Sequence, residues 1–133
     1  MITVLGSINM DLIAKVDRLP KSGETVGGHE FTTAAGGKGA NQALAAGRAG
    51  ATVAMCGAVG NDPFAAPSLA HLESAGVSLA RARSVDGATG TALIMVDTHG
   101  ENIIAVVPGA NGAIDDSDAM AAVDAMNGGD YLL

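Results

Sequence analysis

The sequence has very few aromatic residues and a single cysteine. It contains no tryptophan, and its only aromatic side chains are Phe31, Phe64 and Tyr131. Because 48% of its 133 residues are nevertheless hydrophobic, the core must be built from aliphatic side chains and methionine. A single cysteine excludes an internal disulfide. Cys56 lies in the apolar run 52–59, which predicts a buried, reduced thiol.

Positive charge is also scarce. Seven Lys and Arg stand against fourteen Asp and Glu, which gives a net charge of -7 and no basic run. Nucleic-acid binding is disfavoured, because cations that neutralise phosphates supply most nonspecific affinity. No apolar run approaches the roughly 20 residues of a membrane span, and no basic segment precedes the apolar start. We therefore expect a cytoplasmic protein without a membrane segment.

Histidines are few and scattered. His29, His71 and His99 lie far apart, and none has a second ligand three or four residues away. Such spacing argues against a metal site made by residues of this sequence.

The most informative stretch runs from Ala34 to Gly50. Its glycines allow positive φ and close approach of a ligand, and the alanine-rich run after them predicts a helix ending at Gly50. A glycine-rich loop of this kind predicts free N–H donors at a helix N-terminus, which suit hydroxyl oxygens or a developing anion. Lys38 adds a charge, and Asn41 adds a donor and an acceptor. A purely structural turn remains the alternative.

Two familiar phosphate-binding motifs do not fit this loop. A Walker A loop needs Ser or Thr after its Gly-Lys, where Gly39 stands. A dinucleotide fingerprint needs a third glycine where Gln42 stands. The stretch is therefore either a polar ligand loop of another kind or a structural turn.

Polar side chains follow the first apolar run. Residues 2–8 predict a buried parallel strand, and Asn9 and Asp11 come directly after it. Two residues apart in extended chain, they share a face and would offer an amide and a carboxylate to a polyol. A turn or capping role is the alternative.

The rest of the chain alternates between predicted strands and helices. We expect paired strands at 12–16 and 25–33, a strand at 52–59, and a helix at 63–75 that Gly76 stops. A hairpin of 91–96 and 102–107 is expected next. A helix should then run from an N-cap near Asp115 to about Asn127, with Ala119, Val123 and Met126 on one face, before a last strand that starts at Asp130. Segment 78–90 shows no usable periodicity.

This order predicts an α/β layered fold with a parallel sheet flanked by helices. A smaller β element is expected from segments 11–34 and 90–107. Because the final predicted strand begins where the sequence stops, we expect a fragment of a longer protein with an exposed sheet edge.

The ordered set of motifs resembles the PfkB-type carbohydrate kinases, also called the ribokinase family. The resemblance runs from 4–11 through 20–25 and the glycine-rich loop to 90–94 and 109–111, and so covers essentially the whole sequence. It implies that residues 1–133 are the N-terminal part of a ribokinase-like domain. The implied reaction transfers a phosphoryl group from ATP, with Mg²⁺, to a primary hydroxyl of a sugar, D-ribose first. Another sugar or a nucleoside is the alternative.

The resemblance also implies a set of sugar-binding residues. These are Asn9, Asp11, Gly36, Gly37, Lys38, Asn41, Ala92 and Ile94. Asp11 would accept from two hydroxyls, and the Lys38 head and the Asn41 amide would bind others. Ala92 and Ile94 would lie over the sugar ring, as part of a β lid that excludes water and forms a homodimer contact.

Two motifs of that family do not occur in the sequence. There is no Gly-Ala-Gly-Asp segment, whose Asp is the family's base and whose glycines form its anion hole, and no Asn-x-x-Glu segment. No residue of the sequence is therefore assigned a catalytic role, and the catalytic residues are expected beyond Leu133. The ATP and Mg²⁺ sites are likewise expected mostly outside these residues, and this chain alone is expected to be inactive. A noncatalytic sugar-binding or dimerising remnant is the alternative.

Overall fold

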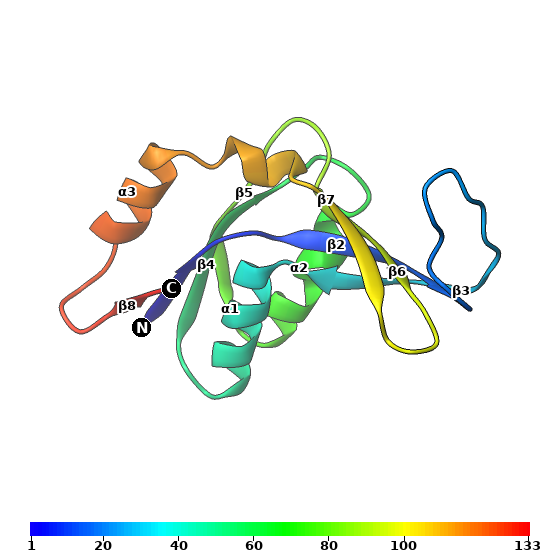
Figure 1. Cartoon of the computed structure of the whole chain (residues 1–133). Helices are drawn as coiled ribbons and strands as arrows, with labels where there is room; N and C mark the ends of the chain where they lie inside the picture. Colours follow the sequence, from blue (N-terminus) through cyan, green and yellow to red (C-terminus); the bar gives the residue numbers. More distant parts are fainter.

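The computed structural model describes all 133 residues and distributes its strands over two sheets (Figure 1). Sheet A is parallel throughout and has the order β5-β4-β1-β8. Its strands are β1 (Ile2–Leu5), β4 (Val53–Val59), β5 (Ser78–Ser84) and β8 (Tyr131–Leu132). The predicted parallel sheet, including its last strand, is confirmed.

Sheet B is the smaller β element expected from segments 11–34 and 90–107. Its strands are β2 (Asn9–Val16), β3 (Gly28–Gly36), β6 (Gly90–Val96) and β7 (Asn102–Val107), in the order β3-β2-β6-β7. β2 runs antiparallel to β3 and parallel to β6, and β6 and β7 form the predicted hairpin. The chain passes directly from β1 in sheet A to β2 in sheet B (Figure 1, blue).

We predicted a single strand over residues 2–8, and this prediction is wrong. β1 ends at Leu5, so Asn9 and Asp11 begin β2 instead of following the first strand. The break has a steric cause at Gly6, where a Cβ would lie 2.9 Å from the Cα of Gly39. The two backbones approach so closely that the chain turns here into the second sheet.

Four helical segments connect the strands. They are α1 (Lys38–Arg48), α2 (Ala65–Ser74), the 3-10 helix η1 (Gly109–Ala113) and α3 (Asp116–Asp124). Gly50 and Gly76, with φ of 91° and 72°, follow α1 and α2 and confirm the predicted stops. None of the helices reaches the length and apolar character that a membrane span requires.

The main core lies between sheet A and the helices α1 and α2. Alternation along β4 places Met55 in this core, whereas Cys56 faces α3 on the other side of the sheet. Val4 and Val53 from neighbouring strands and Leu72 from α2 join Met55 in it. These side chains are fully or almost fully buried, and no aromatic ring is among them, as the composition predicted.

Our prediction that Val123 lies on the buried apolar face of α3 is wrong. That side chain is 47% exposed, whereas Ala122 is 1% exposed. The cause is a bidentate ion pair, in which Arg83 of β5 holds Asp118 at 2.9 and 2.8 Å and turns that side of the helix toward the sheet. Ala122, one turn later, is buried with it. The helix also ends at Asp124, before the predicted end.

β5 lies in the segment where the sequence showed no periodicity. It is an edge strand of sheet A, and its pairing with β4 is irregular between Ala54 and Cys56. Most of its residues are exposed, including Arg81 and Arg83. An irregular edge strand does not need alternating apolar residues, so pattern analysis missed it.

A buried hydroxyl, that of Thr89, anchors the loop before β6 to the loop after β4. The Thr89 hydroxyl donates to Asp62 Oδ1 at 2.6 Å, and the Thr89 N–H donates to Oδ2 at 2.9 Å. The hydroxyl also accepts the N–H of Gly60 at 3.0 Å. The hydrogen bonds from Thr89 hold the pKa of Asp62 below its ordinary value.

Replacing Asp62 by alanine is expected to lower the free energy of unfolding by about 2 kcal/mol, because two donors of buried Thr89 lose their acceptor. The contribution of Asp62 is present above its unfolded pKa of 3.8 and is lost as pH falls through the lower folded value. Urea unfolding at pH 7 and at pH 3 measures both effects. Asp124→Ala on exposed α3 is the control, and equal losses in the two variants at pH 7 would contradict the prediction.

Candidate functional site

An open cavity of about 460 Å³ lies where one face of sheet B meets the N-terminus of α1. Its lining comes from segments far apart in the sequence: Ser7, Asn9, Asp11, Gly37, Lys38, Asn41, Ala92, Ile94, Ile104, Val106, Pro108 and Asn111. The structure thus brings together every predicted site residue except Gly36. It adds residues that were not among the predicted site residues: Ser7, Ile104, Val106, Pro108 and Asn111.

One wall of this cavity is a strip of three neighbouring strands. Asp11 pairs in register with Ala92, and Ala92 pairs with Val106. Two residues further along β6, Ile94 pairs with Ile104. Residues in register share a face, so the carboxylate lies beside an apolar surface. The sequence could have predicted that Ile104 and Val106 of β7 line the cavity together, because alternate residues of a strand face the same side.

Asp11 is a carboxylate that receives no hydrogen bond from the protein. It is half-buried and open to the cavity, and burial raises the pKa of its carboxyl above the ordinary value. Gly36 of the adjacent strand β3 pairs with Asn9 and does not line the cavity. A Cβ on Gly36 would lie 2.4 Å from Asp11 Oδ2, so the glycine makes room for the carboxylate. Asp11 can therefore accept hydrogen bonds from a ligand.

The N-terminus of α1 is less free than we predicted. The Lys38 N–H donates to the hydroxyl of Ser7 at 3.1 Å, and the Ala40 N–H donates to the Ser7 carbonyl at 3.0 Å. Gly37 permits this contact with its φ of 94°, because a Cβ there would lie 2.5 Å from the Ser7 oxygen. Two of the expected free donors are therefore already used by the protein.

The side chains at this helix end remain available. Lys38 is exposed and forms no ion pair within 4.0 Å, and Asn41, one turn later, is also exposed without a side-chain hydrogen bond. Together with Asp11 they give the cavity an ammonium, an amide and a carboxylate. These groups suit a neutral ligand that carries several hydroxyls.

Leu133, beyond which we expect the catalytic residues, directly follows β8 of sheet A and does not line the cavity. Its N–H donates to the carbonyl of Thr3 at 2.9 Å, and its carbonyl accepts the N–H of Leu5 at 2.9 Å. These bonds continue the parallel pairing of β8 with β1. The side chain of Leu133 is 55% exposed and does not line the cavity, so Leu133 is not itself a site residue. The location of the catalytic residues after it stays a prediction.

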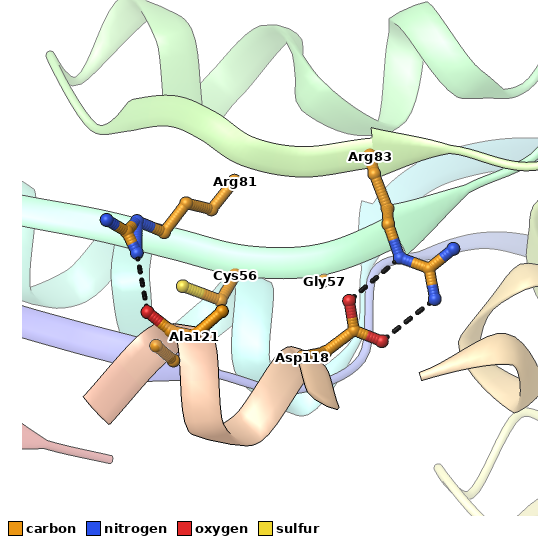
Figure 2. A pocket seen from close by; sticks show the side chains of 7 residues that line it. Cys56, Gly57, Arg81, Arg83, Asp118 and Ala121 are labelled. Atoms are coloured by element: carbon orange, nitrogen blue, oxygen red, sulfur yellow. Dashed lines mark hydrogen bonds and ion pairs between the residues drawn. The ribbon is translucent and has the colours of Figure 1, made fainter. Parts of the chain in front are cut away.

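A second cavity, of about 190 Å³, lies between sheet A and α3 (Figure 2). Arg83 is held there by Asp118, and Arg81 donates to the carbonyl of Ala121 at 3.0 Å. The thiol of Cys56 is free but buried, and burial raises its pKa. The predicted burial of this thiol is confirmed. Because burial disfavours the thiolate, and the Asp118 carboxylate in the same cavity is held by Arg83, this cavity does not favour nucleophilic chemistry.

The residues of this chain do not fit a magnesium–nucleotide site. No three His, Cys, Asp or Glu side chains come together, and Asp11 is the single carboxylate of the larger cavity. Magnesium in proteins prefers several oxygen ligands, usually carboxylates with phosphates. The groups that line the larger cavity suit a polyol better than a metal ion.

The comparison with known proteins assigns the class. The family model described as pfkB family carbohydrate kinase matches residues 1–133, and the chain belongs to this family. The structure accordingly has the layered α/β fold of ribokinase-like proteins, with a parallel sheet and a second small sheet.

Within the family, several of the similar proteins are ribokinases. The chain is 44% identical to the Bacillus subtilis ribokinase over 133 residues, covering 99% of this chain and 45% of that protein. It is 42% identical to the mouse ribokinase over 127 residues, covering 95% and 39%. The structure of Arabidopsis thaliana ribokinase complexed with ribose and ATP matches with a TM-score of 0.76 at 36% identity, covering 90% and 41%. The chain thus spans less than half the length of these relatives.

Proposed function

We propose that this chain carries the sugar-binding and lid part of an ATP-dependent sugar kinase that phosphorylates D-ribose at its primary hydroxyl in the cytoplasm, giving ribose 5-phosphate. The proposal rests on one observation. In the larger cavity, the carboxylate of Asp11, which has no partner in the protein, and the ammonium of Lys38 lie beside an apolar strip of sheet B. The similarity to a ribokinase whose structure holds ribose and ATP supports ribose as the substrate.

In this proposal each group of the cavity has a separate task. Asp11 accepts hydrogen bonds from two sugar hydroxyls, and Lys38 and Asn41 donate to sugar oxygens. Ala92 and Ile94 cover the C–H face of the ring. Sheet B acts as a lid, and its closure over the sugar excludes water, which competes with the sugar as phosphoryl acceptor.

Phosphoryl transfer needs groups beyond those of this cavity. MgATP, when bound, supplies the phosphoryl group and neutralises its charge. A base for the sugar hydroxyl and donors for the phosphoryl oxygens are also required, and the sequence has no motif for either. We therefore expect these 133 residues to bind and orient sugar without turning it over by themselves.

A sugar-binding or dimerising module without turnover is the second candidate function. For the chain alone this function is favoured, because the cavity has a single carboxylate and the chain has no cluster of metal ligands. A PfkB-type kinase for another sugar or a nucleoside is a further alternative, because hydrogen-bonding side chains on an apolar strip suit any polyol ring.

Calorimetric titration of the 133-residue chain with D-ribose, 2-deoxyribose and inosine tests this proposal. We expect ribose to bind most tightly and the Asp11→Ala variant not to bind it. ADP release in the presence of ribose and MgATP should be absent. Turnover that disappears with Asp11→Ala would show that a complete catalytic site exists, and tighter binding of inosine would move the substrate to nucleosides.

The proposal also includes a homodimer through sheet B. The face turned away from the cavity is apolar and exposed, with Leu93 at 49% and Phe31 at 68%. Leu12 of β2 and Ile103 of β7 extend this face across all four strands of sheet B. A second copy of the chain is the proposed occupant, because two such apolar faces can bury each other.

Replacing Leu93 by glutamate is expected to convert the dimer to a monomer, because a charge would be buried in the proposed contact. Analytical ultracentrifugation at equal concentrations measures the change. Val123→Glu, on α3, is the matched control because its side chain is 47% exposed. A dimer that persists in Leu93→Glu, or a monomer already in the unmodified chain, would contradict this contact.

A further inference from the structure

The carboxamide of Asn111 reaches from η1 across to the link between β1 and β2. Its Oδ1 accepts the N–H of Ile8 at 2.9 Å. The two hydrogens of its Nδ2 are shared among three acceptors, the carbonyls of Ile8 and Pro108, each at 3.1 Å, and Asn9 Oδ1 at 2.9 Å. Both ends of this carboxamide are therefore engaged by the protein, although Asn111 lines the cavity.

Backbone groups fix the orientation of Asn111. A backbone N–H can only donate and a carbonyl can only accept, so the N–H of Ile8 requires the oxygen of the carboxamide. The carbonyls of Ile8 and Pro108 require its nitrogen. A reversed Asn111 would place two donors against each other on one side and several acceptors together on the other. Its orientation is thus set without any ligand.

Asn9 takes its own orientation from Asn111. Because Asn111 presents an NH₂ group, only the oxygen of Asn9 can face it, and that oxygen is thereby used. Asn9 is 8% exposed and lines the cavity, so its Nδ2 is the atom left for a ligand. Gly90, paired with Asn9 in β6, leaves space for this arrangement: a Cβ there would lie 2.1 Å from Asn111 Nδ2 and 2.5 Å from Asn9 Oδ1.

We infer that Asn111 is a positioning residue that makes Asn9 a hydrogen-bond donor to the sugar. The inference rests on the proposed function, since it concerns the same cavity. Asn9 and Lys38 then donate while Asp11 accepts, which gives the site a fixed polarity. A sugar must turn an acceptor oxygen toward Asn9 and hydroxyl hydrogens toward Asp11. A ligand that presents a donor to Asn9 is rejected, because two donors would face each other without water between them.

Exchange of side-chain amide protons, measured by NMR on the ¹⁵N-labelled chain, tests this orientation without sugar. We expect slow exchange for the NH₂ of Asn111 and fast exchange for that of Asn9. Added D-ribose should then slow the exchange at Asn9. The reverse pattern in the free chain, with Asn9 protected and Asn111 unprotected, would overturn the inference. The expected pattern without any response to ribose would support the positioning and overturn the proposed function instead.

A double-mutant cycle on ribose affinity tests whether Asn111 acts through Asn9. Asn111→Ala should weaken binding by about tenfold, the effect of losing one well-oriented hydrogen bond. In the Asn9→Ala background the same change should cost nothing further. Equal losses in both backgrounds would overturn the role, because a general structural defect does not depend on Asn9. If Asn111→Ala does not fold, the exchange pattern of the unmodified chain decides alone.

Discussion

Replacing Asp11 by asparagine is expected to weaken D-ribose binding about a hundredfold or more, because two hydrogen bonds to a charged acceptor contribute roughly 1.5 to 3 kcal/mol each. The same change is expected to raise the melting temperature. The Asp11 carboxylate receives no hydrogen bond from the protein, and burial disfavours its ionised form. An amide of the same shape removes that charge.

Titration calorimetry and differential scanning calorimetry on the same preparations measure the two opposite effects of Asp11→Asn. Asp124→Asn is the matched control, because this carboxylate is exposed on α3, away from the cavity. It should change neither quantity. A lower melting temperature for Asp11→Asn would show that the carboxylate has a stabilising partner, and unchanged affinity would remove Asp11 from the sugar site.

The pH dependence of Asp11 follows from the direction of its pKa shift. In the proposed site ribose binds the ionised form of Asp11, so affinity should be constant at neutral pH and fall as pH drops through the folded pKa of Asp11. That pKa lies above 3.8, so the loss begins at a higher pH than for an ordinary aspartate. The effect of pH on folding stability is the opposite of its effect on ribose binding. The ionised Asp11 lowers the free energy of unfolding fully above its folded pKa, and this loss disappears below its unfolded pKa. Binding by Asp11→Asn should be flat over the same range.

Replacing Gly36 by alanine is expected to weaken ribose binding by about ten- to a hundredfold, although Gly36 does not line the cavity. The new Cβ would lie 2.4 to 2.7 Å from the three carboxylate atoms of Asp11, so the carboxylate must rotate away. A displacement of about 1 Å at a binding group can cost that much. Titration calorimetry measures the loss.

Gly128→Ala is the matched control for the Gly36 variant. A Cβ at Gly128 meets nothing within 4 Å, and its φ is not positive, so this alanine should be neutral. A crystal structure of Gly36→Ala should show Asp11 in another rotamer. Full affinity together with a displaced carboxylate would mean that the sugar is not held by Asp11.

Much of the fold could be predicted from the sequence because its signals are local. The glycine-rich loop and the alanine run after it fix the start and the end of α1 without reference to other segments. The two β-rich runs around residues 97–101 form a hairpin for the same reason. The candidate site was predictable where its residues belong to such local motifs, as Lys38 and Asn41 do, or follow the period of a strand, as Asn9 and Asp11 do.

The remaining features depend on contacts between distant segments. The break after β1 results from Gly6 meeting Gly39, and the use of α1 donors results from Ser7, 31 residues before Lys38. The bond between Asn9 and Asn111 spans 102 residues. No pattern within one segment encodes such contacts. An asparagine in a turn-like sequence therefore gave no sign that it orients another asparagine.

The direct passage of the chain from β1 into β2 has a mechanical consequence. Asn9 is the first residue of β2, whereas Val16 is its last. At a rise of about 3.3 Å per residue, a pivot of sheet B by about 10° at the crossing would swing the far end by about 4 Å and move Asn9 by less than about 1 Å. If sheet B acts as the proposed lid, Asn9 lies near its pivot, where it would hold a sugar in place while the far end of the sheet opens.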